Sequence, residues 1–227
     1  MKKIQNNNLE KLNELFFKEF LRSLEKIKKD RIIIWLSGWS SVLSFYDYIK
    51  NNYTKIPEII REKIVYCFLD ERVVALDNND SNYKLLNDNF FKYLKENNLI
   101  TEKNILKIDI NSDDIAWKYY EEVENIDIWL FGVGPDGHTC SLFPLNELLD
   151  DESIWFLDIK NSPKPPTQRI TISKNMLTNI PVWFVFFIWE WKKEALNNFL
   201  NEKLSYTKCP AKLVMECSES ILVSNIY

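Results

Sequence analysis

Glycine and histidine are scarce in this chain of 227 residues, which has four glycines and one histidine, His138. Average glycine usage of about 7% would give roughly sixteen. Glycine is needed where a backbone turns sharply or comes close to a ligand. The two places that keep it, Gly38 and residues 132–137, are therefore the first positions to search for a functional site.

Other absences exclude whole classes of protein. The longest apolar run, residues 180–189, has ten residues and contains Pro181, whereas a membrane span needs about 20. The first thirty residues have no signal-peptide core, and the net charge of −4 is unlike that of a non-specific nucleic-acid binder. We therefore expect a cytoplasmic protein, a monomer that binds neither nucleic acid nor membrane.

Cysteine and histidine do not form a metal-binding pattern. The four cysteines include no C-x-x-C pair, and one histidine cannot complete a common zinc site. We expect four reduced thiols, no metal and no cofactor.

Apolar runs alternate with amphipathic stretches along the whole chain. The runs predict strands at residues 32–36, 64–69, 104–108, 126–131, 154–159, 169–173, 182–188 and 221–224. Helical spacing predicts helices at residues 9–27, after residue 41 to about 49, 113–123, 192–204 and around 211–216. Asp80-Ser81 can cap a further helix, which carries Leu85, Leu86, Phe90, Phe91 and Leu94. This order predicts one α/β domain over residues 1–227, with a mainly parallel twisted sheet and helices on both faces.

Three polar clusters follow predicted strands. They are Ser37-Gly38-Trp39-Ser40-Ser41, then Asp70-Glu71-Arg72 at the end of the strand 64–69, and the glycine turn 132–137 with His138 after it. Ligands of parallel sheets bind beyond the carboxyl ends of the strands. We therefore expect the three clusters to meet at one edge of the sheet.

The glycine turn admits more than one interpretation. Gly132-Val133-Gly134-Pro135-Asp136-Gly137 satisfies G-x-G-x-x-G, but it does not follow the first strand, and Pro144 would interrupt the helix that a dinucleotide requires. His138 is either a structural residue or a general base, since neutral imidazole accepts a proton near neutral pH. No G-x-S-x-G elbow is present, and Ser141 is too close in sequence to be a convincing triad partner. A base acting on water is the simpler hypothesis.

The remaining polar residues suit an anion. Backbone N–H groups and hydroxyls at residues 37–41 favour either a phosphate cradle or an ordinary helix cap. Arg72 and Arg169 have the geometry to bind a phosphate or carboxylate through two hydrogen bonds, although surface ion pairs are the commoner use of such residues. With Lys192, they would supply the local positive charge that an acidic protein needs for an anionic substrate.

Five blocks, in order, resemble the 6-phosphogluconolactonase family. They are residues 37–41, residues 69–72 with 80–83, residues 132–144, residues 162–171 and residues 192–196. The resemblance implies a Rossmann-like fold and hydrolysis of 6-phosphoglucono-δ-lactone, a sugar phosphate, without metal or cofactor. It implies that His138 activates water, that Arg72 holds substrate or oxyanion, and that Asp70 orients the substrate or neighbouring side chains. It also implies a substrate-binding set of Ser37, Gly38, Ser40, Ser41, Asp136, Arg169 and Lys192.

The chain departs from the family pattern at two glycines, where it has Trp39 and Trp189. Two alternatives stay open. One is the related glucosamine-6-phosphate deaminase group, which usually has an acidic residue shortly after the histidine, where this chain has Ser141-Leu142-Phe143-Pro144. The other is an inactive protein that binds sugar phosphates.

Overall fold

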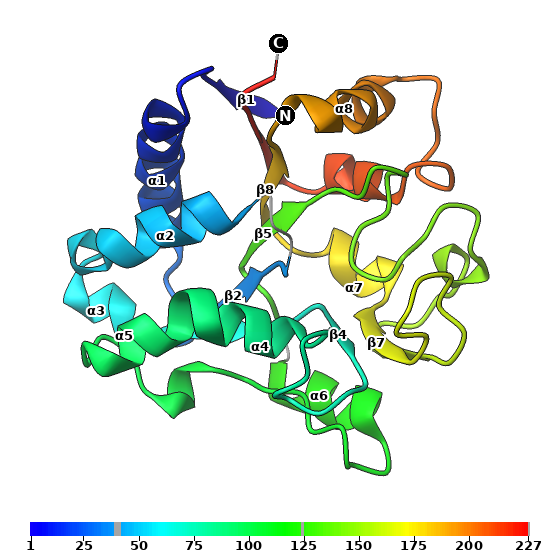
Figure 1. The fold of residues 1–227 in the computed structure, drawn as a ribbon, viewed down its shortest axis with the longest axis horizontal. Helices are drawn as coiled ribbons and strands as arrows, with labels where there is room; N and C mark the ends of the chain where they lie inside the picture. Colours follow the sequence, from blue (N-terminus) through cyan, green and yellow to red (C-terminus); the bar gives the residue numbers. More distant parts are fainter. Residues whose placement is uncertain (39–41, 124, 227) are drawn as a thin grey trace.

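The computed structural model describes residues 1–38, 42–123 and 125–226. At its centre is a parallel six-stranded sheet with the strand order β1-β9-β8-β5-β2-β3 (Figure 1). The strands are β1 (Lys2–Gln5), β2 (Ile32–Leu36), β3 (Ile64–Cys67), β5 (Ile128–Gly132), β8 (Val182–Phe187) and β9 (Glu219–Ser224). The predicted fold class is confirmed.

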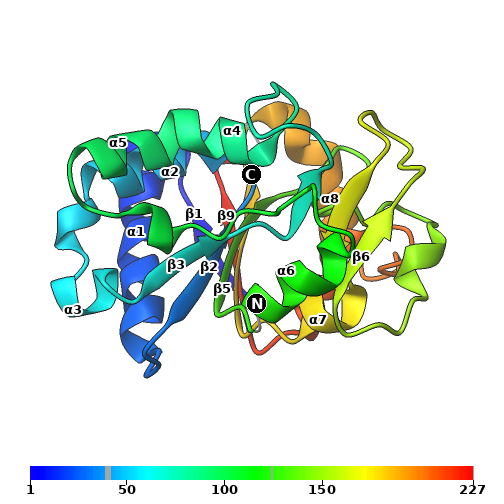
Figure 2. The same ribbon diagram turned by 90° about the horizontal axis from the view of Figure 1, so that it is seen from below.

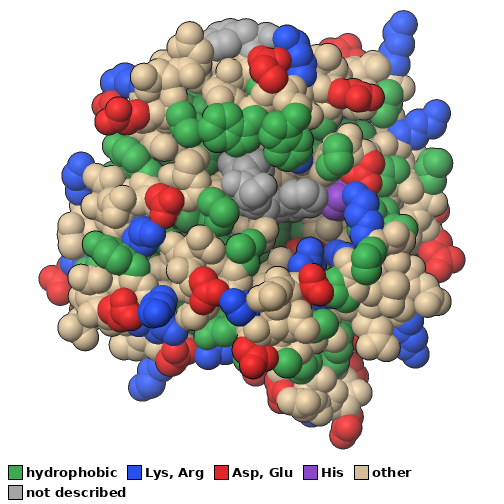
Figure 3. All heavy atoms as spheres, viewed as in Figure 1, with side chains coloured by type: hydrophobic (Ala, Val, Ile, Leu, Met, Phe, Trp, Pro, Cys, Tyr) green, Lys and Arg blue, Asp and Glu red, His purple; other side chains and the backbone are tan. Residues whose placement is uncertain are grey.

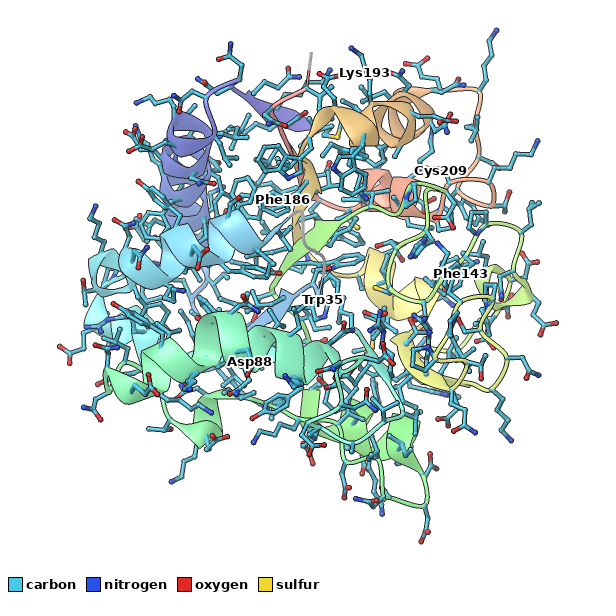
Figure 4. The ribbon with its side chains drawn as sticks, viewed as in Figure 1. Trp35, Asp88, Phe143, Phe186, Lys193 and Cys209 are labelled. Carbon is cyan, nitrogen blue, oxygen red and sulfur yellow. The ribbon has the colours of Figure 1, made fainter. Side chains whose placement is uncertain are left out.

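The central strands are apolar because both of their faces are covered. Every residue of β2, β5 and β8 is buried. Trp35, Trp129 and Trp183 occupy neighbouring register positions on these three strands, and their rings form a row of tilted contacts, with centroids 4.5 and 4.1 Å apart. Phe186 contacts Phe45 at 4.4 Å between ring centroids, on the opposite side, and Figure 4 shows Trp35 and Phe186 on their strands. Burial on both faces explains the uninterrupted hydrophobic runs in the sequence.

Helices cover both faces of the sheet (Figures 1 and 2). On one side lie α1 (Leu9–Lys26) and α2 (Leu43–Asn51), and on the other α6 (Ile115–Val123) and α7 (Lys174–Thr178). The α1 helix is capped by Asn8, whose side chain accepts a hydrogen bond from the Lys11 N–H at 2.9 Å. A stripe of fully buried side chains at helical spacing then attaches α1 to the sheet: Leu12, Phe16, Phe20 and Leu24.

A second sheet corrects the prediction for residues 70–72. These residues do not end the preceding strand but form their own strand, β4 (Asp70–Arg72), in an antiparallel sheet with β7 (Arg169–Ile172) and β6 (Phe156–Ile159). The order is β4-β7-β6, and the sheet packs beside α6. Because β4 pairs with β7, cationic residues almost a hundred positions apart in the chain become neighbours.

The other elements are short helices and turns. They are α3 (Glu58–Arg61), α4 (Asn82–Leu86), a π turn (Asn87–Phe91), α5 (Lys92–Glu96), α8 (Lys193–Leu200), and 3₁₀ turns at Tyr53–Lys55, Glu102–Asn104, Glu147–Leu149, Glu190–Lys192 and Pro210–Glu216. Ser81 caps α4, as predicted.

Three predicted elements were wrong. Residues 104–108 form no strand and contribute only a single bridge, from Ile105 to Tyr66. The α8 helix ends at Leu200, four residues early, and residues 211–216 form a 3₁₀ rather than an α-helix. Sequence patterns also did not predict β1, whose burial is confined to Ile4, or the five-residue α7.

Candidate active site

A cavity of about 170 Å³ lies beyond the carboxyl ends of β2 and β5. Its walls come from five segments that are distant in sequence: Gly38, Asp70, Arg72, Asn82, His138, Cys140, Lys164, Pro165 and Arg169. Figure 3 shows the histidine beside a hollow in this face, with Lys and Arg side chains next to it. A larger cavity of about 380 Å³ lies at the opposite end of the sheet, where Lys29, Ile126 and Pro181 precede their strands. Among the described residues that line it, only Lys29 and Tyr120 are ionisable.

The glycine turn presents His138 to the first cavity. The Gly134 N–H donates to the His138 carbonyl at 3.0 Å, and the Gly137 N–H donates to the Gly134 carbonyl at 2.9 Å. Gly137 has a φ of 83°, a left-handed conformation that favours glycine. A Cβ at Gly134 would overlap Nδ1 of His138 and lie 2.6 Å from Oδ1 of Asp136. The turn therefore needs glycine so that the imidazole can fold back over it.

His138 lies in a hydrogen-bonded group with Asp136 and Lys164. Its Nδ1 contacts Oδ1 of Asp136, whose Oδ2 accepts a hydrogen bond from Nζ of Lys164 at 2.9 Å. The Lys164 Nζ also lies 3.4 Å from Nδ1 of His138. His138 is only 3% exposed, and its ring stacks on Phe143 with 4.6 Å between ring centroids. Phe143 therefore fixes the plane of the imidazole, and Asp136 fixes its rotation.

The electrostatics of this group favour a neutral imidazole beside an ionised carboxylate. Burial lowers the pKa of His138; Asp136 opposes this effect, and Lys164 adds to it. Burial alone would raise the pKa of Asp136, but the hydrogen bonds from His138 and Lys164 outweigh it and bring that pKa well below its usual range. An ionised carboxylate only accepts hydrogen bonds, so Nδ1 carries the imidazole proton and Nε2 carries the lone pair.

Asp70 is buried at the floor of the cavity and is held by two neighbours. Its Oδ2 accepts a hydrogen bond from the Ser141 hydroxyl at 3.1 Å, and its backbone carbonyl accepts one from the Asn82 amide at 2.9 Å. Ser141 therefore bonds to Asp70 rather than to His138, which agrees with its exclusion as a nucleophile. Glu71 points away from the cavity and accepts the backbone N–H groups at the start of α4.

Arg72 and Arg169 are directly opposite each other in the pairing of β4 with β7. The buried Arg169 anchors the proline-containing loop: its Nε donates to the Pro166 carbonyl at 2.9 Å, and its Nη2 donates to the carbonyls of Lys164 and Pro165 at 2.9 and 3.1 Å. Its Nη1 donates to the Ser141 hydroxyl at 3.3 Å. These bonds use four of the five guanidinium N–H donors.

Lys192 lies behind the glycine turn, outside the residues that line the cavity. Its buried ammonium donates to the carbonyl oxygen of Val133 and lies 4.3 Å from the ring centroid of Trp191. Burial lowers the pKa of Lys192 to about 8, with Asp136 raising it and Lys164 lowering it. Its ammonium is therefore attached to the backbone of the turn and lies within the field of Asp136 and Lys164.

The predicted site residues are thus divided. Gly38, Asp70, Arg72, His138 and Arg169 line one cavity, while Asp136 contacts His138 from the side. Ser37 is buried, and its carbonyl accepts a hydrogen bond from Tyr46 at 2.8 Å. Ser40 and Ser41, together with Trp39, lie outside the described residues.

Four lining residues were not assigned from the sequence, although all lie in blocks that were singled out: Asn82, Cys140, Lys164 and Pro165. Lys164 and Asn82 are the two with polar side chains that can bond a ligand. Lys164 is the one cation in the predicted loop 161–167, and Asn82 follows the capping serine of α4. A lysine between prolines after a strand is a usable signal, because the loop is stiff and its ammonium has few positions to occupy. No sequence signal distinguishes Asn82 from the many other asparagines of this chain.

Two further observations concern ligands and membranes. Within residues 1–38, 42–123 and 125–226, no three His, Cys, Asp or Glu side chains gather in a way that would hold a metal ion. In the same part of the chain, no helix is long and apolar enough to cross a membrane. All four cysteines are free thiols, as expected.

The fold and the cavity together define a class of protein: a doubly wound α/β protein with a histidine–carboxylate pair and several cations at the carboxyl edge of its sheet. A sequence model of the family glucosamine-6-phosphate isomerases/6-phosphogluconolactonase matches residues 7–223. The chain belongs to this family.

Individual relatives agree with this assignment. The 6-phosphogluconolactonase of Borreliella burgdorferi is 32% identical over 223 residues, which cover 95% of this chain and 92% of that protein. The human 6-phosphogluconolactonase is 33% identical over 154 residues, covering 65% of this chain and 59% of that protein. The family resemblance read from the five sequence blocks is thereby confirmed.

Solved structures share the fold at lower identity. The 6-phosphogluconolactonase of Thermotoga maritima superposes with a TM-score of 0.80 at 23% identity, covering 99% of this chain and 100% of that chain. A monomeric glucosamine-6-phosphate deaminase gives a TM-score of 0.77 at 17% identity, covering 99% and 97%. Because both activities occur on this fold, the fold alone does not separate them.

Proposed function

We propose that this protein hydrolyses 6-phosphoglucono-δ-lactone to 6-phosphogluconate. This proposal rests on one observation. An imidazole that is bonded through Nδ1 to an ionised aspartate lines the same cavity as the cations Arg72, Lys164 and Arg169. The relatives named 6-phosphogluconolactonase support this substrate. A lactone ring with a phosphate needs both a base for water and positive charge for the anion.

The chemistry follows from the orientation of the imidazole. Nε2 of His138 accepts a proton from water as the water oxygen attacks the lactone carbonyl carbon. The carbonyl oxygen becomes an oxyanion, which Arg72 stabilises from the cavity wall. When the tetrahedral intermediate collapses, the bond to the ring oxygen breaks, and the imidazolium returns its proton to that oxygen. Asp136 stabilises the imidazolium between the two transfers.

The remaining cations hold the phosphate and the loop. The Gly38 backbone binds the 6-phosphate, together with the Ser37 hydroxyl, which is buried without a hydrogen-bond partner among the described residues. Lys192 contributes positive charge from behind the glycine turn, and Arg169 contributes charge while it fixes the loop. Asp70 orients the substrate from the floor of the cavity. Anchoring the phosphate places the carbonyl beside His138, and such positioning can lower the barrier by several kcal/mol.

The decisive experiment is a lactonase assay with freshly prepared 6-phosphogluconolactone, coupled to oxidation of the product, with spontaneous hydrolysis subtracted. We expect clear acceleration with the phosphorylated lactone and a much lower kcat/KM with unphosphorylated gluconolactone. Equal kinetics on the two lactones would contradict a phosphate site. Binding of 6-phosphogluconate without acceleration would instead identify an inactive sugar-phosphate binder.

The fold shared with the deaminase makes ammonia release from glucosamine 6-phosphate the necessary second assay. We expect no release of ammonia. Residues 139–144, which follow the histidine, include no acidic residue, and Ser141 among them is bonded to Asp70. Deamination at a rate comparable to lactone hydrolysis would overturn the proposal.

We further propose that residues 1–227 act as one domain and as a cytoplasmic monomer. A single cluster of buried hydrophobic residues extending from Ile4 to Ile226 supports the first statement. Sedimentation of the purified chain tests the monomer, and fractionation of its source cells tests the compartment.

A further inference from the structure

Lys164 approaches the catalytic pair from a different part of the chain than the glycine turn. Its side chain is 43% exposed and crosses the cavity wall to end 2.9 Å from Oδ2 of Asp136 and 3.4 Å from Nδ1 of His138. It also lies 5.5 Å from the ring centroid of Phe143, the ring on which the imidazole stacks. One ammonium thus lies close to Asp136, to the imidazole itself and to the ring on which the imidazole stacks.

The backbone of Lys164 is fixed more firmly than that of an ordinary surface loop. The Arg169 Nη2 donates to the Lys164 carbonyl itself at 2.9 Å, and the Ser162 N–H donates to the Thr167 carbonyl at 2.9 Å, which closes the loop. A flexible lysine on a mobile loop would lose much of its interaction energy to side-chain entropy. Here the hydrogen-bonded loop backbone restricts the positions that the Lys164 ammonium can occupy.

We propose that Lys164 is a positioning residue for the His138–Asp136 pair: it holds the outer carboxylate oxygen of Asp136, so that the inner oxygen faces the imidazole, and it disfavours protonation of His138. The expected effect of Lys164 on catalysis rests on the proposed function. Its expected effect on the protonation of His138 does not. The proposal assigns a task to a residue that the sequence left without one.

The sign of the effect follows from the charges around the imidazole. Lys164 repels an imidazolium directly, and by bonding to Asp136 it reduces the charge that this carboxylate offers to His138. Both contributions lower the pKa of His138, in the same direction as burial. Among the described residues, the other ionisable groups near the pair are Asp70, Arg72 and Arg169 on β4 and β7, Lys192 behind the turn, and the thiols of Cys140 and Cys209. None of these changes in a Lys164 variant.

The direct test is NMR titration of the imidazole, which needs no assignment because the chain has one histidine. We expect Lys164→Met and Lys164→Gln to raise the pKa of His138 by roughly 0.5–1 unit. Lys164→Arg, which keeps the charge, should leave it near the parent value. The matched control is Lys160→Met, which removes an exposed lysine of the same segment outside the cavity. An unmoved His138 pKa in both neutral variants would overturn the proposal.

Kinetics supply the second test. In Lys164→Met we expect the acid limb of the kcat/KM profile to move upward by the same amount, so that the deficit grows as the pH falls through this limb and approaches about threefold to tenfold well below the pKa of His138. A pH-independent loss would indicate a purely structural role, and a raised KM with an unmoved limb would indicate a substrate contact; either result overturns the proposal. A parent protein without lactonase activity would refute the proposed function and leave the titration experiment intact.

Discussion

Arg72 and Arg169 face each other across the antiparallel pairing of β4 with β7, although like charges at directly opposed positions repel. The two guanidiniums avoid competition because they have different partners. Arg169 is bonded to the carbonyls of residues 164–166, whereas Arg72 donates to the Asp80 carbonyl. The Nε of Arg72 is buried without a hydrogen-bond partner among the described residues. Arg72 is therefore the better candidate to bind an anionic ligand, whereas Arg169 holds the loop in place.

This division predicts opposite outcomes for the two methionine substitutions. Arg72→Met should lower kcat/KM by about 10²-fold, because it removes a charged donor from the oxyanion, and should change the free energy of unfolding by less than about 1 kcal/mol. Arg169→Met leaves three loop carbonyls without their donor and should lower the free energy of unfolding by about 2–4 kcal/mol. Urea denaturation and steady-state kinetics on both variants provide the comparison. Equal stability of the two variants would contradict it.

A side chain at position 134 should impair catalysis for a purely steric reason. The φ of Gly134 is not in the left-handed region, so alanine is permitted there by the backbone, but the added Cβ would overlap Nδ1 of His138. We expect Gly134→Ala to displace the imidazole from Asp136 and to lower kcat by about 10²–10⁴-fold, as His138→Ala would. Affinity for 6-phosphogluconate, measured by calorimetry, should change little in either variant. Full activity in Gly134→Ala would mean that the imidazole has another productive position.

The sequence predicted the central elements well because their patterns are local. The five apolar residues of β2 and the capping serine of α4 lie where expected. The convergence of Gly38, Asp70 and His138 at one edge followed from a rule about parallel sheets and is present in the structure. These are properties that neighbouring residues or a general topology determine.

What the sequence did not predict depends on contacts between distant residues. Asp70–Arg72 is too short and polar to signal a strand, and it becomes one only because β7 supplies the pairing. The task of Arg169 depends on where the loop carbonyls lie, and the contact of Lys164 with Asp136 joins residues 28 positions apart. Single-sequence patterns contain no information on such pairings.

The lowered pKa of Lys192 predicts how ligand affinity depends on pH. Burial lowers its pKa to about 8, so its charge is present below that pH and is lost as the pH rises through it. We expect the affinity for 6-phosphogluconate to fall by up to about tenfold per pH unit above this value. Calorimetry from about pH 6.5 to 9.5 measures the effect. In Lys192→Met, affinity should be weaker and lose this dependence.

The matched control for that experiment is the next residue. Lys193, labelled in Figure 4 at the start of α8, is 52% exposed and pairs with Glu190 at 3.5 Å. Lys193→Met removes the same charge from the same segment without altering the turn, and should leave the pH dependence of the parent unchanged. If Lys193→Met abolished the dependence, or Lys192→Met retained it, Lys192 would not be the titrating group.

At position 189 we expect the usual order of stability of alanine and glycine variants to be reversed. Trp189 occupies a position where the family pattern has glycine, and its backbone has a φ of 77° and a ψ of 142°, a conformation that side chains resist. The Trp189 N–H donates to Oδ1 of Asn225 at 2.9 Å, which holds the segment in place. The chain therefore retains a conformation suited to glycine while carrying an indole that is 45% exposed.

Trp189→Gly and Trp189→Ala both remove the indole, so the difference between them isolates the backbone. Alanine normally stabilises relative to glycine by about 0.4–1 kcal/mol, because it restricts the unfolded chain. Strain at this φ should reverse that order and make Trp189→Gly more stable than Trp189→Ala by about 1–3 kcal/mol. The free energy of unfolding in urea measures the difference. A more stable alanine variant would show that the backbone relaxes to a negative φ once the indole is gone, and that the side chain imposes the conformation.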